Sequence, residues 1–531
     1  MNSKIQDEAI LEGLLKDALK KNINNQKDLQ TLKNSYCLKY KISSPSNVAL
    51  IATYRKMLKE GEIRENKLFF NLIRKRKIRS QSGIANITVL TKPYKCPGNC
   101  IFCPSEPDMP KSYLSDEPAM MRAILNDFDA YRQVENRLMG LTRTGHPTDK
   151  IEMIISGGTF SYYPKSYQTA FIRGIYNALN NKQSRSIVEA IKINETSAHR
   201  CVGLSVETRP DWIDENEIKR MRELGATKVE IGIQTLDDKV LKLNKRGHGV
   251  EEIKKAMKLL KDAGFKINAH IMPNLYGSNK QKDLENFKKL FTNSDFRPDW
   301  LKIYPCVVTP YSKLAKIWKN GDYKSYTDNE LIDLLIKMKL LVPEYVRIAR
   351  LYRDIPADSI LGGSKLSNLR QHVIKKMWEK GERCKCIRCR EIRDEQIQVQ
   401  DVELQELEYE SSGGKEHFLS FVDTKKDKLI SFLRLRIPSQ VINNKKHFMN
   451  ELQNAAVIRE LHTYGTHLAL DDHQKKAVQH KGFGKKLINK AESIVTSYGI
   501  NKIAVISGVG VREYYRNRGF ELVGTYMIKN L

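Results

Sequence analysis

The spacing of hydrophobic residues changes along this chain, and the changes divide it into three segments. In residues 1–80 apolar side chains recur three and four positions apart, for example within 10–19, which predicts amphipathic helices. From 84 to about 310, short apolar runs alternate with longer stretches of helical period. From about 400 to the end, several strand-like runs surround a helix. We therefore expect a helical segment, then alternating strands and helices, then a mixed α+β segment.

The middle segment contains six strand candidates with helical sequence between them. They lie at 84–90, 151–156, 202–207, 229–234, 267–272 and 301–308. Repeated strand–helix units predict a parallel sheet, which we expect to curl into a partial (β/α)6 barrel. Sites in such barrels lie at the C-terminal ends of the strands, so the residues that follow each strand are the first candidates for chemistry.

Three cysteines follow the first predicted strand. Cys96, Cys100 and Cys103 stand at C-x3-C-x2-C. Thiolates hold a [4Fe–4S] cluster, and three thiolates leave one iron open to bind and reduce a substrate. This spacing is typical of radical S-adenosylmethionine (SAM) enzymes, whose open iron chelates SAM. A zinc site is the alternative, but zinc usually takes four ligands and this loop has no fourth Cys or His.

The ends of the later strands supply candidate SAM contacts. Gly157 and Gly158 end the second strand, and glycines let the backbone approach a ligand closely. Glu207 ends the third strand and can bind the ribose hydroxyls or the amine, or else pair with the arginine two positions on. Gln234 can donate to the nucleoside. His270, at the end of the fifth strand, is either a chemical group or a packed, hydrogen-bonded residue.

A second group of cysteines lies in the connector after the barrel. Cys384, Cys386 and Cys389 stand at C-x-C-x2-C, which predicts a structural zinc site with a fourth ligand from elsewhere. His372 is a candidate for that ligand. A second iron–sulfur centre is the alternative. The connector also carries a basic stretch at 347–353, which we expect to contact phosphates.

The C-terminal segment contains a glycine motif at a predicted helix start. Residues 479–484 read Q-x-x-G-x-G, and glycines there expose backbone N–H groups that suit a pyrophosphate. The pattern is typical of GNAT acetyltransferases, which grip coenzyme A with it. Tyr514 and Tyr515 stand where such enzymes place a tyrosine near the thioester, and one of the two is expected only to pack in the core.

Composition and charge narrow the choice of partners. The 531 residues hold 91 Lys and Arg against 62 Asp and Glu, a net charge of +29, which favours a polyanion such as nucleic acid. A bias towards lysine without any partner is the alternative. The expected phosphate-contacting strip comprises Arg74, Lys75, Arg76, Lys77 and Arg79. The sequence has no apolar run of membrane length and no apolar signal core, and six of its nine cysteines are clustered, which predicts a reducing, cytoplasmic compartment.

Taken together, these motifs closely resemble the family of Elongator catalytic subunits over residues 75–531. The stretches that carry the resemblance are 78–79, 82–85, 117–118, 121–123, 157–160, 207–211, 459–462 and 502–510. The resemblance implies an enzyme that carboxymethylates uridine-34 of tRNA with SAM and acetyl-CoA, and an N-terminal region that helps to hold the tRNA. The acetyl-CoA positions that it implies are Lys150, Arg459, Glu460, Leu461, His462, Gly482, Phe483, Gly484, Tyr514 and Tyr515. The cysteine loop is similar to that of bacterial and archaeal members, so the need for Elongator-like subunits, as opposed to self-association, is open.

In the mechanism that the resemblance implies, SAM cleavage gives a 5′-deoxyadenosyl radical that takes hydrogen from the acetyl methyl group. The acetyl radical adds to C5 of the uridine, and thioester hydrolysis leaves a carboxymethyl group. An electron donor is then required, and Lys150, Glu460, His462 and Tyr514 become the candidate catalytic residues of the protein. A lysine acetyltransferase with a structural cluster, using Glu460 beside His462 as its base, is the alternative enzyme. A nucleic-acid-binding scaffold with inert sites is a third.

The expected domains are a helical, basic tRNA-binding region at 1–80, the radical-SAM barrel at 81–342, a connector at 343–399 and a GNAT domain at 400–531.

Overall fold

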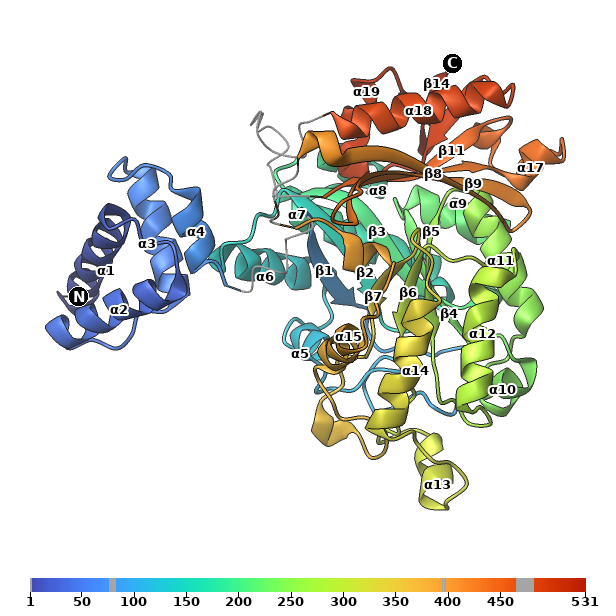
Figure 1. The fold of residues 1–531 in the computed structure, drawn as a ribbon, viewed down its shortest axis with the longest axis horizontal. Coiled ribbons are helices and arrows are strands. Elements are labelled where there is room, and N and C mark those ends of the chain that lie inside the picture. Colours follow the sequence, from blue (N-terminus) through green and yellow to red (C-terminus); the bar gives the residue numbers. More distant parts are fainter. Residues whose placement is uncertain (1, 76–82, 394, 396–397, 465–481) are drawn as a thin grey trace.

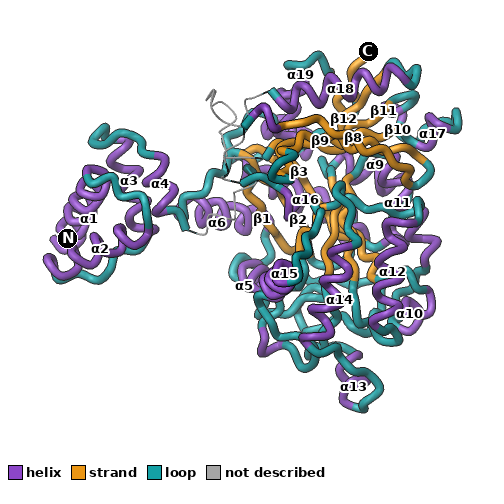
Figure 2. The backbone as a smooth tube through the Cα atoms, viewed as in Figure 1, coloured by secondary structure: helices purple, strands orange, loops and turns teal. Residues whose placement is uncertain are grey.

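A computed structural model describes residues 2–75, 83–393, 395, 398–464 and 482–531. A helical lobe stands apart from a larger body, which contains two sheets stacked end to end (Figure 1). In the body the strands lie at the centre and most of the helices cover them from outside (Figure 2). This arrangement confirms the predicted α/β class, a partial barrel followed by an α+β domain.

The N-terminal lobe comprises four helices around their own apolar core. They are α1 (Asn2–Lys20), α2 (Gln26–Tyr40), α3 (Asn47–Lys59) and α4 (Lys67–Ile73). Leu14, Leu50 and Phe69 are fully buried between them. Arg55 joins the lobe to the body by donating to the carbonyl oxygen of Thr142 at 2.7 Å. In the described part of the chain, no helix has the length and apolar character needed to cross a bilayer.

The barrel sheet has seven parallel strands in sequential order. They are β1 (Ala85–Leu90), β2 (Lys150–Ser156), β3 (Arg200–Thr208), β4 (Lys228–Gln234), β5 (Lys266–Ile271), β6 (Trp300–Ile303) and β7 (Arg347–Arg350). The prediction of six strands was therefore wrong by one. The missed strand β7 has only four residues and two of them are arginines, so it looked like part of a basic connector.

Helices separate the strands of this sheet. Their bounds are α5 (Pro118–Ile124), α6 (Ala130–Arg143), α7 (Lys165–Asn180), α8 (Ile187–Asn194), α9 (Glu215–Glu223), α10 (Asp238–Leu243), α11 (Val250–Asp262), α12 (Lys280–Thr292), α13 (Leu314–Lys319) and α14 (Asp328–Leu340). The connector adds α15 (Leu369–Glu379) and α16 (Ile387–Arg390).

The inward-facing side chains of the barrel are charged. Alternate positions of β4, such as Val229 and Ile231, belong to the apolar core under the helices. The alternate positions of β4 that point into the barrel carry Lys228 and Glu230. Lys228 pairs with Glu152 of β2, and Glu230 pairs with Lys302 of β6. A barrel interior is usually filled by branched apolar residues, so this interior is unusually polar.

The second sheet has the strand order β13-β14-β12-β11-β10-β9-β8. Its strands are β8 (Val402–Ser411), β9 (Gly414–Asp423), β10 (Lys428–Ile437), β11 (Ala456–Thr463), β12 (Lys502–Val505), β13 (Glu521–Val523) and β14 (Tyr526–Asn530). Its helices are α17 (Ser439–Ile442), α18 (Phe483–Ser497) and α19 (Arg512–Arg516). The expected single strand at 521–527 is two strands, and β8 was not expected because its side chains are mostly exposed.

A buried ion-pair network joins the two sheets. Arg459 of β11 contacts Asp299, just before β6, at 2.5 Å and Glu416 of β9 at 2.9 Å. Arg436 of β10 contacts Asp262 at the end of α11 at 2.6 Å. All five side chains are at most 1% exposed. The second domain therefore packs against the N-terminal ends of the barrel strands.

We expect Arg459→Met to destabilise the protein strongly, because it leaves Asp299 and Glu416 buried without their main cation. Breaking one side of a buried pair costs about 3–5 kcal/mol, which urea unfolding measures. The matched control is Lys415→Met, which removes the partner of Glu408 on the surface and should cost at most about 1 kcal/mol. Equal losses for the two variants would contradict a structural role for the network.

Candidate functional site

The predicted cluster loop lies at the C-terminal ends of the barrel strands. The loop follows β1, and the main chain of Ile101 donates to Asn244 and accepts from Leu314 at 3.2 and 2.8 Å. These two partners lie after β4 and β6, on segments that are distant in sequence. Phe102 and Ile101 pack in a small apolar cluster with Val308. The loop is thus fixed by several neighbouring strand ends at once.

Two arginines approach Cys100. Arg246 Nη1 lies 3.2 Å and Arg209 Nη1 lies 3.9 Å from its sulfur. A hydrogen bond from Cys103 and the charges of Arg246 and Arg209 lower the pKa of Cys100 well below its ordinary value, against the effect of burial. A thiolate, the form that ligates iron, is therefore favoured at this position.

Arg246 could not be identified from the sequence, because it lies 146 positions from the cysteine that it contacts. Arg209 was considered only as a partner of Glu207, but its carboxylate partner is Asp211 at 2.9 Å.

Cys96, Cys100 and Cys103 form a donor set that fits a cluster. All three are free thiols, and the sulfur of Cys96 lies 3.8 Å from Oγ1 of Thr159, which is in the turn after β2. The three sulfur atoms are farther apart than the ligand atoms of a single metal ion. This spacing agrees with a cubane cluster, in which each thiolate binds a different iron atom.

The predicted SAM residues surround this loop. Gly157 has a φ of 128°, and a Cβ there would lie 2.1 Å from Thr91 Oγ1, so only glycine fits. Gly158 has a φ of 103°. Glu207 accepts a hydrogen bond from the Tyr113 hydroxyl at 2.8 Å. Buried Gln234 has a φ of 72°, and its Oε1 has no hydrogen-bond partner within the described ranges.

His270 lies deeper in the barrel than these residues. Its Nε2 is 3.3 Å from Glu230 Oε2, and its ring meets Tyr304 edge-on. The histidine is thus part of the charged barrel interior, and this contact is compatible with either of its predicted roles.

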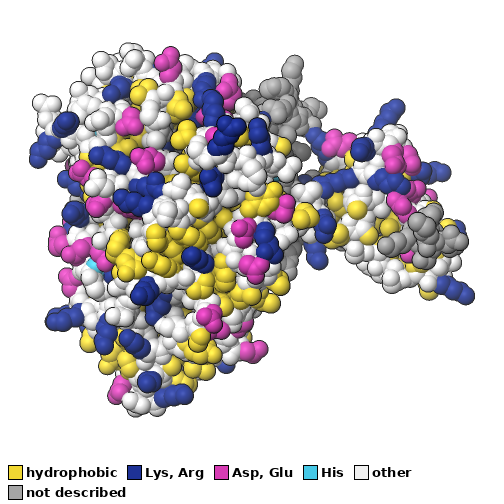
Figure 3. Space-filling view, turned by 180° about the vertical axis from the view of Figure 1, so that it is seen from behind, with side chains coloured by type: hydrophobic (Ala, Val, Ile, Leu, Met, Phe, Trp, Pro, Cys, Tyr) yellow, Lys and Arg dark blue, Asp and Glu magenta, His cyan; other side chains and the backbone are white. Residues whose placement is uncertain are grey.

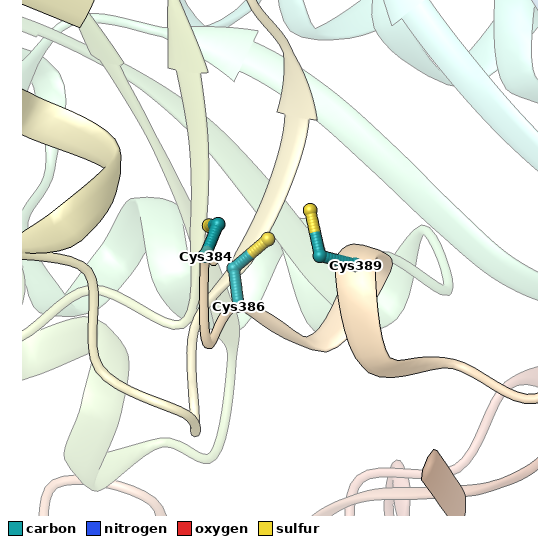
Figure 4. Close-up of side chains that lie close together, drawn as sticks. All are labelled: Cys384, Cys386 and Cys389. Atoms are coloured by element: carbon teal, nitrogen blue, oxygen red, sulfur yellow. The ribbon is translucent and has the colours of Figure 1, made fainter. Parts of the chain in front are cut away.

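The three connector cysteines converge. Cys384 and Cys386 lie on the loop before α16, and Cys389 lies on that helix (Figure 4). Their sulfurs are within 4.8 Å of one another, the only such group of ligands found among the described residues. Lys339 Nζ and Arg370 Nη2 lie 3.6 and 3.8 Å from the Cys389 sulfur. Three thiolates held by cations fit a metal ion.

His372 is not part of this group, so its prediction as the fourth ligand is wrong. Its side chain is exposed on α15, outside the set of converging ligand atoms. The cysteine segment does link the two sheets: Ile387 N donates to Val346 beside β7, and Ile392 N donates to Leu429 of β10.

The strands β11 and β12 diverge towards the end of β11. The two strands pair in parallel only as far as Ile458 and Val505. At that point Arg459 is the extra residue of a bulge in the β10–β11 ladder, and bulges are frequent beside active sites. From Glu460 to Thr463, β11 keeps β10 as its partner on one side, while its other edge no longer pairs with β12. We call this edge of β11 the acyl slot, after the ligand that the resemblance implies.

The glycine motif lies at one end of the acyl slot. Gly482 has a φ of 75° and caps α18, which begins at Phe483. A Cβ on Gly484 would lie 2.9 Å from the Tyr514 hydroxyl and 3.9 Å from both Leu461 and Thr463. The helix start, β11 and Tyr514 thus converge. Gln479, the first residue of the motif, is outside the described residues.

The two predicted tyrosines have different roles in packing. Tyr515 is 5% exposed and meets Phe520 edge-on, so it belongs to the core, as expected of one of the pair. Tyr514 remains partly exposed, and its pKa is raised by burial.

Arg459 and Glu460 direct their side chains to the domain interface. Arg459 is in the network described above, and Glu460 accepts from Arg434 at 2.8 Å. Burial alone would raise the pKa of Glu460, but Arg434 and Lys266 outweigh it and lower the value. Only their main-chain groups remain available to the slot. Binding of acetyl-CoA at Arg459 and Glu460 therefore stays a prediction that concerns their main chain.

Leu461 and His462 are half-buried on the same stretch of β11. Lys150 is the first residue of β2 and is half-buried beside Arg200, its neighbour in β3. Burial lowers the pKa of Lys150. Lys150 is therefore at the N-terminal end of the barrel, on the side of the second domain.

The acyl slot and the cluster loop lie at opposite ends of the barrel. The residues after β12 pack on the start of β3, since Gly508 and Gly510 would clash there with Val202 and Arg200 if they carried a Cβ. The cluster loop follows the other end of the strands. β2 spans 7 residues, so the two ends are about 20 Å apart along a strand.

Only part of the predicted phosphate strip is described. Arg74 lies over the ring of Phe70, and Lys75 is exposed. Arg76, Lys77 and Arg79 are outside the described residues. Lys and Arg side chains are also scattered over the face shown in Figure 3, on lobe and body alike, among hydrophobic and acidic side chains.

The second basic stretch is largely neutralised. Arg347 pairs with Glu391 at 2.6 Å, Arg350 with Asp354 at 2.5 Å and Arg353 with Glu117 at 2.8 Å. We therefore correct the expectation that this stretch contacts phosphates.

Comparison with known proteins places the chain among characterised sequences. Residues 90–290 match the Radical SAM superfamily and residues 298–379 match the Radical SAM C-terminal domain. The chain is 44% identical to the tRNA uridine(34) acetyltransferase of Methanocaldococcus infernus, over 98% of each chain. It is 38% identical to Elongator complex protein 3 of Saccharomyces cerevisiae, over 97% of this chain and 94% of the yeast protein. The solved structure of an N-terminally truncated Elp3 from Methanocaldococcus infernus matches with a TM-score of 0.74 and 43% identity, covering 85% of this chain and all of that one.

We expect Cys386→Ser to lose a bound metal and to loosen the junction between the sheets. Elemental analysis of the purified protein, with thermal unfolding, measures both effects. The control is Cys37→Ser, which changes a partly exposed cysteine of α2 and should keep the metal. A metal site here would be contradicted if the wild-type protein contained no zinc and no more iron than one cluster requires.

We expect Cys100→Ala to lose the visible absorbance of the iron–sulfur cluster, because the loop provides only three thiolates and the cluster needs all three. Cys306→Ala, a buried cysteine of the same apolar cluster, should retain it. Undiminished absorbance and iron content in Cys100→Ala would show that the loop is not the cluster site.

Proposed function

Because the chain belongs to the family that includes tRNA uridine(34) acetyltransferase and Elongator complex protein 3, we propose that it modifies uridine-34 of tRNA. The proposed reaction attaches a carboxymethyl group, derived from acetyl-CoA, to C5 of the base. The observation that supports the proposal is the presence of two different candidate sites on one chain. A three-cysteine loop lies at one end of the barrel, and the acyl slot faces the other.

In this proposal Cys96, Cys100 and Cys103 hold a [4Fe–4S] cluster, and the turn at Gly157 and Gly158 binds SAM. When bound, the reduced cluster and SAM supply a carbon-centred radical, which is chemistry that protein side chains do not provide. The chain's contribution is to bind, orient and shield. Arg246 and Arg209 stabilise the Cys100 thiolate, while Glu207 and the unpartnered oxygen of Gln234 are the polar contacts for the nucleoside.

The acyl slot holds acetyl-CoA in the same proposal. The N–H groups at Gly482, Phe483 and Gly484 bind the diphosphate at the helix start. The edge of β11 at Leu461 and His462, which does not pair with β12, orients the long arm of the cofactor, and Tyr514 lies beside it. Because the two sites lie about one strand length apart, roughly 20 Å, the flexible arm of coenzyme A is the part that can bridge them. Lys150 stands at the barrel end of that path.

The alternative, lysine acetylation with an inert cluster, is not favoured. It needs a general base with a pKa near neutrality, but the pKa of its best candidate, Glu460, is lowered by Arg434 and Lys266. The name of the Methanocaldococcus infernus relative also refers to tRNA.

Further elements of the proposal concern the metal, the partners and the compartment. The Cys384 group binds zinc as a structural site between the sheets, with a second cluster as the alternative. Arg74, Lys75 and the rest of that strip contact tRNA phosphates. An electron donor, and either Elongator-like subunits or a second copy, complete the system. All nine cysteines are free thiols, which suits a reducing cytoplasm.

We expect the reconstituted full-length protein to add a carboxymethyl group to uridine-34 only when SAM, acetyl-CoA and a reductant are all present. Mass analysis of tRNA nucleosides measures the product, and parallel detection of consumed SAM separates this reaction from simple acetylation. Modification that proceeds without SAM would contradict the proposal, as would acetylated protein with unmodified tRNA.

A further inference from the structure

Lys266 has no assigned role, and its ammonium group is unpaired. It is the first residue of β5 and is half-buried. No hydrogen bond or ion pair of its ammonium is found within the described parts of the chain. Its neighbour in β4, Lys228, is instead held by Glu152. A half-buried lysine that no carboxylate of the described residues contacts can pair with a bound ligand.

The residues that affect the pKa of Lys266 indicate where it lies in the fold. Burial lowers its pKa, and the nearest carboxylates, Glu460 and Glu152, raise it again. Glu460 belongs to β11 and lies 3.5 Å from the indole nitrogen of Trp300 in β6. Lys266 is therefore at the barrel end that faces the second domain, beside the stretch of β11 that borders the acyl slot.

The two ends of the acyl slot differ in chemistry. At the outer end, Leu461 and Thr463 adjoin Gly484 and the start of α18, which suits a diphosphate. At the closed end, where β11 and β12 still pair at Ile458, the stretch begins with Glu460, whose side chain turns to Trp300 at the barrel end where Lys266 lies. An acyl-CoA that lies along the edge of β11 with its diphosphate at α18 would place its thioester at the Lys266 end.

Resting on the proposed function, we propose that Lys266 is a substrate contact for the acyl end of acetyl-CoA. Its ammonium donates a hydrogen bond to the thioester carbonyl oxygen. This contact gives the otherwise unpaired cation an acceptor, and it distinguishes acetyl-CoA from free CoA, which lacks that carbonyl. Lys266 and Lys150 then lie at the same barrel end, contributed by different strands.

A purely structural role for Lys266 leads to a different expectation. The ammonium lies in the field of Glu460 and Glu152 and would then only balance their charge at the domain interface. Its removal would destabilise the protein and weaken every ligand of the slot to the same degree. The comparison of acetyl-CoA with CoA separates these two roles.

The test is calorimetric titration of the full-length protein with acetyl-CoA and, separately, with CoA. Lys266→Met should weaken acetyl-CoA binding by about tenfold or more, the effect of losing one charged hydrogen bond. CoA binding should change by less than about twofold. Lys266→Arg, which keeps the charge and a donor, should recover part of the loss. The control Lys255→Met, on the exposed face of α11, should bind both ligands as the wild type does.

Equal weakening of both ligands, or no change in either, would overturn the inference while leaving the proposed function intact. Failure of the wild-type protein to bind acetyl-CoA would overturn the proposed function itself. If Lys266→Met does not fold, Lys266→Gln provides the same comparison between the two ligands.

Discussion

The buried ion pairs between the barrel and the second sheet determine how the rest of the molecule is arranged. Asp299 and Glu416 share the guanidinium of Arg459, and Asp262 pairs with Arg436, all out of contact with water. A buried charge without its partner is strongly destabilising, so a shift of one domain against the other is disfavoured. The consequence is that the open side of β11 always faces the N-terminal ends of the barrel strands.

A second consequence is the separation of the two sites. The cluster loop is fixed by main-chain bonds to segments after β4 and β6, at the far end of the same barrel. Between the two ends the inward positions are ionic, from Glu152 with Lys228 to Glu230 with Lys302 and His270. Such an interior is a poor source of stability compared with a packed apolar one.

The sequence predicted those features that depend on local patterns. The cysteine spacing after a strand located the cluster loop, and Gly157 and Gly158 were recognised because the turn needs residues without a side chain. It did not reveal Arg246, Asp299 or Lys266, since each acts on residues far away in the chain and has no distinctive neighbours.

The motif at 459–462 was also incompletely understood from the sequence. The bulge at Arg459 turns the charged side chains of Arg459 and Glu460 towards the interface and leaves only their main chain at the slot. No periodicity in the sequence indicates such a bulge. The very short β7 and the exposed β8 were missed for a related reason, because tertiary pairing and not local composition defines them.

We propose that acyl-CoA and SAM bind at opposite ends of one barrel. Hydrogen–deuterium exchange with each ligand alone tests it most directly. We expect acetyl-CoA to slow exchange at the main chain of 460–463 and at the start of α18. We expect SAM to slow exchange at the turn of Gly157 and Gly158. Protection of that turn by acetyl-CoA, without protection of β11, would contradict it.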